Sequence, residues 1–386
     1  EIYTLSLHDA LPIWSALSAD VRECLEPGVA AFSAVLPELF ARWRQRFPSC
    51  KDQLVVLPSF EQVRGDKSAF ATMTRLAQRQ TNPFNAAPML QMHGEQGVLL
   101  WPPSRPLTTE QLDHVHELPF QRRAHPSYSK PVPALASVHR SITAVRGCFG
   151  GCAFCSITEH QGRAIQSRSP ASVVREAETL AADRHFDDTI ADVGGPSANM
   201  YRMGCSDANL ARLCRRYSCL HPKPCRHLQT DHQPLMQLLE RVRKVDGVKH
   251  VFVNSGIRYD VAALSKPFVR QIALHHTSGQ LSVAPEHCEP HVLQRMRKPA
   301  VEYYERFALE FTQASERAGK QQYLIPYLIV GHPGETLSDT IALALYLKKH
   351  NLRPRQIQEF IPTPMTVATC MYYADQIGRA SCRERV

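Results

Sequence analysis

Three cysteines in a short glycine-rich segment have the spacing of metal ligands. Cys148, Cys152 and Cys155 lie in the run Arg146-Gly-Cys-Phe-Gly-Gly-Cys-Ala-Phe-Cys-Ser156 and are spaced C-x3-C-x2-C. A cubane iron–sulfur cluster usually takes four thiolates, one for each iron, so three cysteines leave one iron free to bind another molecule. Because a catalytic metal needs an open coordination position, this cysteine triplet predicts a 4Fe-4S cluster at a catalytic site.

The triplet is expected to lie on a loop. On a helix, three thiolates at this spacing could not converge from the faces they would occupy. Three glycines in the segment give the backbone the freedom to wrap around a metal: Gly147, Gly150 and Gly151. The alternative is a zinc site with His160 as the fourth ligand, because soft sulfur ligands select zinc or iron–sulfur centres. Zinc motifs more often pair two cysteines with two distant ligands, which favours the cluster.

The sequence around the triplet resembles a known superfamily. With Phe154 as the aromatic residue, C-x3-C-x-aromatic-C is similar to the signature of radical S-adenosylmethionine (SAM) enzymes. Longer strings resemble the YgiQ-type (UPF0313) family, a group of radical SAM proteins of unassigned reaction, and the resemblance runs from about Leu54 to Asp375. These strings are Arg146 to His160, Gln166-Ser-Arg-Ser169, Asp192-Val-Gly-Gly-Pro-Ser-Ala-Asn-Met-Tyr201, Val283-Ala-Pro-Glu-His287 and Gln322-Tyr-Leu-Ile-Pro-Tyr327.

The resemblance implies a mechanism and a set of cofactor contacts. The open iron would bind the amino and carboxylate groups of SAM, and one-electron reduction would yield methionine and a 5'-deoxyadenosyl radical, while the protein supplies orientation. A one-electron donor such as flavodoxin or ferredoxin is the implied partner. The resemblance places SAM contacts at Phe154 and Gly331 near the adenine, at the carbonyls of Gly194 and Gly195, and at Glu286, with His287, near the ribose or carboxylate.

Simpler structural roles compete with three of these contacts. Pro196 stands where many radical SAM proteins have an acidic residue, so only a carbonyl contact carries over, and Gly195 can equally form a tight turn. Glu286 can form a structural ion pair with Arg258. The glycine motif that begins at Gly331 can have a simpler role, because Gly334 and Glu335 can simply begin the next helix, where acids are favoured.

The second half of the chain alternates strand-like and helix-like segments. Strands are expected at 137–145, 189–193, 248–253, 281–284, 323–330 and 356–361, with helices at 170–180, 235–242, 267–275, 301–318 and 336–349 between them. Six strands separated by helices predict βα units and a parallel sheet. The chemically distinctive residues follow the strands, as in parallel barrels, where active sites lie at the carboxyl ends of strands. The resemblance implies an α/β fold, a partial (β/α)6 barrel of radical SAM type.

The domain organisation is expected to follow this pattern. Residues 134–376 form the predicted radical SAM core, truncated at its C-terminal end. Residues 14–133, with a helix expected at 29–40, form the predicted end of an N-terminal domain and a linker. Residues 1–13 and 377–386 resemble translated frames of a common sequencing adapter and are expected to be foreign.

A second group of cysteines follows the Gly-Gly turn. Cys205, Cys214, Cys219 and Cys225 are spaced x8, x4 and x5, with histidines between them. Four thiolates can close a site completely, as in structural zinc or an auxiliary iron–sulfur cluster. The alternative is that several are ordinary buried thiols. Their density in a polar, arginine-rich insertion favours a second metal site.

The composition narrows the cellular context. The chain has 386 residues, twelve cysteines and a formal net charge of +9. Eleven cysteines remain without the adapter-like Cys382, and this odd number in metal-like spacings predicts a reducing cytoplasm rather than a disulfide framework. No apolar run reaches the length of a membrane-spanning helix. The basic charge allows a nucleic-acid partner such as RNA, although a solvated basic surface is the commoner meaning.

Three functions are compatible with the triplet: a radical SAM enzyme, a non-catalytic zinc-binding module with a basic, RNA-binding surface, and an electron carrier. The chemically distinctive residues follow the predicted strands, as active-site residues do in parallel barrels, and this favours the enzyme. A zinc-binding module does not need such an arrangement. An open iron position argues against a carrier.

Overall fold

The computed structural model describes residues 30–33, 54–94 and 96–377, which divide into two compact units. The N-terminal unit contains the described residues up to Arg105 together with 208–217 and 369–377, and the core unit contains 106–207 and 218–368. Within the described part of the chain, no helix is long and apolar enough to cross a membrane.

The core unit is an α/β structure. Its strands are β5 (Ser141–Thr143), β6 (Val145–Arg146), β7 (Gln166–Ser167), β8 (Thr189–Ile190), β9 (Asp192–Gly194), β10 (Gly204–Cys205), β11 (Leu228–Gln229), β12 (His250–Val251), β13 (Gln280–Glu286), β14 (Tyr323–Val330) and β15 (Gln358–Glu359). Its helices are α6 (Thr109–Glu117), α7 (Pro133–Val138), α8 (Ile157–His160), α9 (Pro170–Ala181), η1 (Ala198–Met200), α11 (Gln233–Arg243), α12 (Tyr259–Ala262), α13 (Lys266–His275), α14 (Pro290–Met296), α15 (Val301–Arg317) and α16 (Leu337–Lys349).

The principal strands of the core unit run parallel, as predicted. β5 pairs with β9, β8 with β12, and β14 with both β13 and β15, all in parallel. Backbone hydrogen bonds beyond these ladders connect the chain segments of β9 and β12, and an isolated parallel bridge joins Ile257 to Val283 of β13. Strands that are neighbours in space therefore follow one another along the chain, as they do in a partial parallel barrel.

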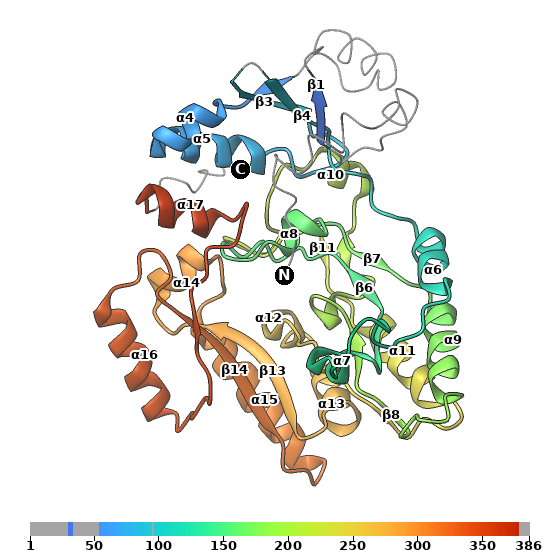
Figure 1. Ribbon diagram of the computed structural model, residues 1–386. Coiled ribbons are helices and arrows are strands. Elements are labelled where there is room, and N and C mark those ends of the chain that lie inside the picture. Colours follow the sequence, from blue (N-terminus) through green and yellow to red (C-terminus); the bar gives the residue numbers. More distant parts are fainter. Residues whose placement is uncertain (1–29, 34–53, 95, 378–386) are drawn as a thin grey trace. The chain divides into compact units, whose positions relative to one another are not determined.

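The core lies between the strands and the helices that follow them. Alternate strand residues such as Val193, Val251 and Leu281 are fully buried, and they belong to one apolar cluster with helical residues such as Leu238 and Phe307. Figure 1 shows α9 and α11 side by side on one flank of the core unit and α16 on another. Polar residues can therefore occupy the loops at the strand ends without interrupting the core.

Local signals set several helix ends. α9 begins at Pro170, as predicted, and the Ser169 side chain caps it by accepting a hydrogen bond from the N–H of Ser172. α15 ends before Gly319, whose positive φ of +66° is typical of a residue that follows a helix. Thr108 and Gln111 form a capping box for α6, a helix that was not predicted in the segment 14–133.

Some predicted elements were wrong in their bounds or in their type. The strand expected at 356–361 is limited to β15, Gln358–Glu359. The strand expected at 137–145 is shorter, because α7 continues to Val138 and β5 begins only at Ser141. The helix expected at 29–40 was wrong for Ala30–Ser33, which form β1 and pair antiparallel with β4 (Gln96–Leu100). Pairing with a distant strand overrides a local helical pattern. Residues 29 and 34–40 lie outside the described residues.

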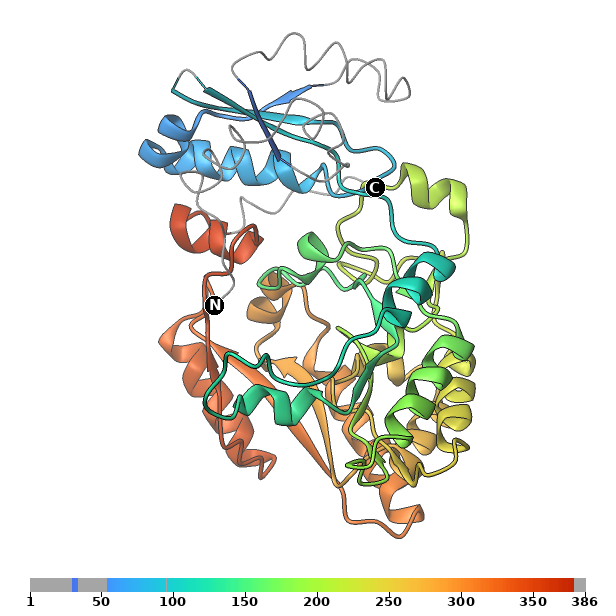
Figure 2. The same cartoon turned by 45° about the vertical axis from the view of Figure 1, so that its right-hand side comes forward.

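The N-terminal unit is a small sheet with helices. Its four strands have the order β1-β4-β3-β2, where β3 is Met89–His93 and β2 is Val55–Val56. Its helices α4 (Phe60–Gly65) and α5 (Lys67–Gln78) lie on one face of the sheet (Figure 2). The unit also contains α10 (Ala208–Leu213), and α17 (Val367–Ala374) begins in the core unit and continues into this one.

Candidate functional site

The cysteine triplet lies on a loop, as predicted. β6 and β7 pair antiparallel and close the base of this loop. The loop begins at Gly147, whose φ is +87° and where an added Cβ would lie 3.1 Å from the carbonyl carbon of Ala164 and closer still to its oxygen. Backbone hydrogen bonds hold the loop from two sides, from Cys148 N–H to Gly162 O at 3.0 Å and from Ala153 N–H to Met296 O at 2.9 Å. The loop conformation is therefore set by the chain itself.

The three thiols of the triplet interact electrostatically with one another. Burial raises the pKa of Cys148, and a charge on Cys152 raises it further. Burial raises the pKa of Cys155 to about 12, with further contributions from Cys152 and Cys148. The cysteines thus form one group, and a bound cation is what would hold all three as thiolates.

The residues of the triplet leave the choice of metal open, because thiolates bind both zinc and iron–sulfur centres. His160, the alternative zinc ligand, is exposed at the end of α8.

Glu286 closes β13 in an unusual backbone conformation. Its φ is +69°, and the pairing of β13 with β14 shifts in register between Val283 and Glu286. A non-glycine residue with such a φ is strained, and such strain clusters at ligand sites. Its buried carboxylate lies 3.5 Å from Lys298 Nζ, and burial raises its pKa. The ion-pair partner of Glu286 is therefore Lys298, and Arg258 pairs with Asp260 instead.

His287 and Glu335 link the ends of β13 and β14. His287 Nδ1 accepts the N–H of Glu289 at 3.0 Å, so its proton is on Nε2, which lies 3.4 Å from Glu335 Oε1. Glu335 also accepts hydrogen bonds from the N–H of His332 at 3.1 Å and from Thr340 Oγ1 at 2.7 Å. Both side chains of the His287–Glu335 pair are at most 1% exposed. Glu335 thus does more than begin α16, whose N-cap is Thr336.

Phe154 and Gly331 lie near the carboxyl end of β14. The Phe154 ring meets the His332 ring edge-on, with centroids 6.3 Å apart, and it packs against the buried cluster that contains Ile329. Gly331 follows the strand with φ +73°, and an added Cβ would meet no atom within 4 Å. The structure thus brings Phe154 of the cysteine loop beside His332. Gly331, which precedes His332, borders open space.

Gly194 and Gly195 are enclosed by neighbouring atoms. An added Cβ at Gly194 would lie 3.1 Å from Asp192 Oδ2 and closer still to Ser255 Oγ. At Gly195 it would lie 2.8 Å from Val145 Cγ1 and closer still to the Val145 carbonyl oxygen. The Gly194 carbonyl accepts the N–H of Ala144 at 2.8 Å. Close packing beside the cysteine loop is thus a sufficient reason for both glycines.

The second group of cysteines is divided between the units. Cys205 is exposed on β10, which pairs with β11, and the N–H of Cys225 donates to Cys219 O at 2.8 Å. Cys219 also packs near Phe149 in a small apolar cluster. Cys214 belongs to the N-terminal unit. A second metal site at these cysteines stays a prediction.

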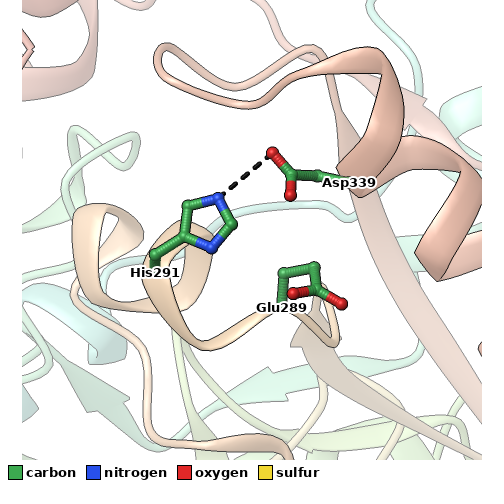
Figure 3. A group of neighbouring side chains, drawn as sticks. All are labelled: Glu289, His291 and Asp339. Atoms are coloured by element: carbon green, nitrogen blue, oxygen red, sulfur yellow. Dashed lines mark hydrogen bonds and ion pairs between the residues drawn. The ribbon is translucent and has the colours of Figure 1, made fainter.

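The group of Glu289, His291 and Asp339 shown in Figure 3 is explained by a helix cap. His291 Nε2 lies 3.1 Å from Asp339 Oδ2. The same oxygen accepts hydrogen bonds at 2.8 Å from both the N–H and the Oγ1 of Thr336, in the capping box that begins α16. A metal ion here would compete with the helix cap, so the carboxylate already has a structural role.

Arg258 makes a contact with the triplet that the sequence did not reveal. Its Nη1 donates to Cys152 Sγ at 3.4 Å, and its other guanidinium nitrogens bind Asp260. Arg258 precedes α12, after the segment of β12, and its side chain is 10% exposed. An arginine beside a distant cysteine carries no local sequence signal, because the contact spans the fold.

Sequence comparisons identify relatives over most of the chain. Residues 22–141 match the family described as Radical SAM N-terminal, and residues 142–347 match the Radical SAM superfamily. A UPF0313 protein of Rhodopseudomonas palustris is 48% identical over 325 residues, covering 84% of this chain and 48% of that protein. UPF0313 protein YgiQ of Escherichia coli is 45% identical over 321 residues, covering 83% of this chain and 43% of that protein. The chain spans about half the length of these curated relatives.

A solved structure with a similar chain path is the radical SAM methyltransferase TsrM from Kitasatospora setae, with cobalamin and a 4Fe-4S cluster bound. It has a TM-score of 0.42 and 17% identity, and the match covers 64% of this chain and 39% of that one. The assignment rests on the sequence matches, of which the superfamily match covers more than half of the chain. The chain therefore belongs to the radical SAM superfamily, and its relatives there are the UPF0313 proteins.

Proposed function

We propose that this chain is the catalytic core of an enzyme that binds a 4Fe-4S cluster through Cys148, Cys152 and Cys155 and cleaves SAM reductively. The observation that carries the proposal is the triplet itself, three cysteines on one loop that β6 and β7 close, just after β5, which pairs in parallel with β9. When bound, such a cluster supplies the electron that converts SAM to methionine and a 5'-deoxyadenosyl radical. The electron would come from a donor such as flavodoxin or ferredoxin in the cytoplasm, where thiols stay reduced.

The chain's own residues would orient SAM. Phe154 and Gly331 would border the adenine, because the loop aromatic and the open space at the glycine lie at the same strand end. Glu286 would face the ribose or carboxylate, and its strained backbone supports a role in ligand contact. The contribution of Gly194 and Gly195 would be positional, because they let β9 pack against Val145 just before the loop.

Anaerobic reconstitution with iron and sulfide tests this proposal. The wild-type protein should become brown, show the electron paramagnetic resonance (EPR) signal of a reduced 4Fe-4S cluster and release 5'-deoxyadenosine from SAM when reduced. Cys152→Ala should lose all three properties, because each thiolate holds one iron. Cys288→Ala is the control, since Cys288 is a buried free thiol outside the triplet and packs against Leu328 and Leu343 in a separate cluster. A colourless protein with zinc at the triplet would refute the proposal and support the zinc-binding alternative.

A second metal at Cys205, Cys214, Cys219 and Cys225 is a separate proposal. The hydrogen bond between Cys225 and Cys219, and the hairpin that carries Cys205, support it. Metal analysis of a variant with alanine at all three triplet positions should still find zinc or iron. A folded variant that is free of metal after anaerobic purification would show that these residues are plain thiols.

A further inference from the structure

A buried guanidinium contacts one sulfur of the triplet. Arg258 Nε and Nη2 donate to the two carboxylate oxygens of Asp260 at 2.9 and 2.6 Å. Its Nη1 donates to Cys152 Sγ at 3.4 Å. Both side chains of the Arg258–Asp260 ion pair are 10% exposed. The carboxylate therefore fixes the plane of the guanidinium, and one edge of that plane faces the sulfur.

The protein holds Arg258 in place from its backbone as well. The N–H of Arg258 donates to Asn199 Oδ1 at 2.8 Å, and Asn199 Nδ2 donates to Arg258 O at 3.0 Å. Asn199 is fully buried. On the loop side, an added Cβ at Gly150 would lie 3.1 Å from Arg258 Nη1, so the glycine leaves room for the guanidinium. The contact with Cys152 is thus prearranged by residues from three parts of the core unit.

A buried ion pair such as Arg258–Asp260 is often no more stabilising than apolar residues in the same space. Burying an ion pair carries a desolvation penalty that often exceeds the attraction, and apolar residues of similar volume are frequently as stabilising. The pair is therefore weak evidence for a role in stability. Its direction toward a thiol of the triplet points instead to a role at the metal centre.

We propose that Arg258 raises the reduction potential of the cluster bound to the triplet, with Asp260 holding the guanidinium and partly offsetting its charge. This inference rests on the proposed function. The reaction concerned is the gain of one electron from a one-electron donor such as a reduced flavodoxin or ferredoxin. Hydrogen bonds to the ligand sulfurs and nearby charge set the potential of such clusters. A cation beside Cys152 favours the reduced state, because that state carries one more negative charge.

Redox titration of the reconstituted protein in the absence of SAM tests the inference, with the reduced cluster followed by EPR. In Arg258→Met, the ratio of reduced to oxidised cluster at a fixed solution potential should fall at least about tenfold, which is a midpoint lower by about 59 mV for one electron. Asp260→Asn should shift the midpoint the opposite way, because it removes a buried negative charge. The double variant should lie between the two. Without SAM, a shift cannot arise from a lost contact between Arg258 and SAM.

Control variants distinguish a specific effect on the reduction potential from a general loss of structure. Arg122→Met also removes a half-buried arginine that pairs with a carboxylate, Glu176, and it should leave the midpoint unchanged. Should Arg258→Met fail to fold, Arg258→Lys keeps the charge but loses the planar set of donors, and it should lower the midpoint by a smaller amount. A cluster that forms with an unchanged midpoint in the folded Arg258 variant overturns the inference alone. If the wild-type protein forms no cluster, the proposed function itself fails.

Discussion

Replacing Gly195 by alanine should destabilise the core unit far more than the same change at Gly204. The added Cβ at Gly195 would lie 2.8 Å from Val145 Cγ1 and closer still to the Val145 carbonyl oxygen. Carbon atoms in contact are normally about 3.5 to 4.0 Å apart, so the backbone after β9 would have to move away from Val145. Because the φ of Gly195 is not in the left-handed region, the effect would be steric.

The expected magnitude follows from two losses and one gain. Overpacking of this kind costs about 1–3 kcal/mol. Movement of the strand end also weakens the hydrogen bond from Ala144 N–H to Gly194 O, which contributes about 1 kcal/mol. Alanine restricts the unfolded chain and returns about 0.4–1 kcal/mol. The free energy of unfolding should therefore fall by about 1–4 kcal/mol, a large fraction of the stability of a typical domain.

Urea unfolding of the apoprotein, followed by circular dichroism, measures this difference. Gly204→Ala is the control, since an added Cβ there would meet no atom within 4 Å, and its unfolding free energy should stay within about 1 kcal/mol of wild type. Equal stability of the two variants would refute the steric argument. The presence of glycine at position 195 would then have to be explained by contact with a ligand rather than by close packing.

Three further predictions concern other parts of the core unit. Gly331→Ala should still fold, with an unfolding free energy lower by about 1–2 kcal/mol, because alanine must adopt φ +73°. The variant should bind SAM at least about tenfold more weakly in calorimetry. An unchanged affinity would show that SAM does not bind beside Gly331. Glu176→Gln should lower the unfolding free energy by about 3 kcal/mol, because Arg122 and Arg168 both bind the largely buried carboxylate of Glu176. A decrease of less than about 1 kcal/mol in urea unfolding would contradict this prediction. Burial lowers the pKa of His276 to about 4 in the folded protein. As the pH falls below 6.5, this histidine is therefore protonated in the unfolded protein before it is protonated in the folded one. The stability that the neutral histidine contributes is full above pH 6.5 and is lost as the pH falls toward 4. His276→Gln should therefore flatten the fall of the urea midpoint between pH 6.5 and 4.5, and an identical pH profile would count against the buried neutral histidine.

Local signals were sufficient for much of the core unit. The strand predicted at 323–330 matches β14, because an apolar run between turn residues needs little tertiary context. Ser169 and Pro170 likewise mark the start of α9, since cap and first-turn preferences act over a few residues. The helix predicted at 29–40 was wrong for Ala30–Ser33 because their partner, β4, lies far along the chain. A short apolar segment does not reveal whether a distant strand will pair with it.

The same distinction holds for the candidate site. The loop that carries the triplet could be predicted because its three cysteines and three glycines lie within one short segment, where spacing alone restricts the conformation. The partner of Glu286 could not, because choosing between Arg258 and Lys298 depends on where the loops after two different strands lie in space. The contact between Arg258 and Cys152 is of the same kind.

The charges beside the triplet bear on the proposed metal site. Arg258 is paired with Asp260, and Lys298 with Glu286, so each buried cation has a carboxylate partner. The two cations favour a thiolate at Cys148, yet burial outweighs them and its pKa is raised. In the proposed function, the charge that holds three thiolates together would therefore come from the bound metal. Metal binding would then displace the thiol protons, which would couple occupancy of this site to its protonation.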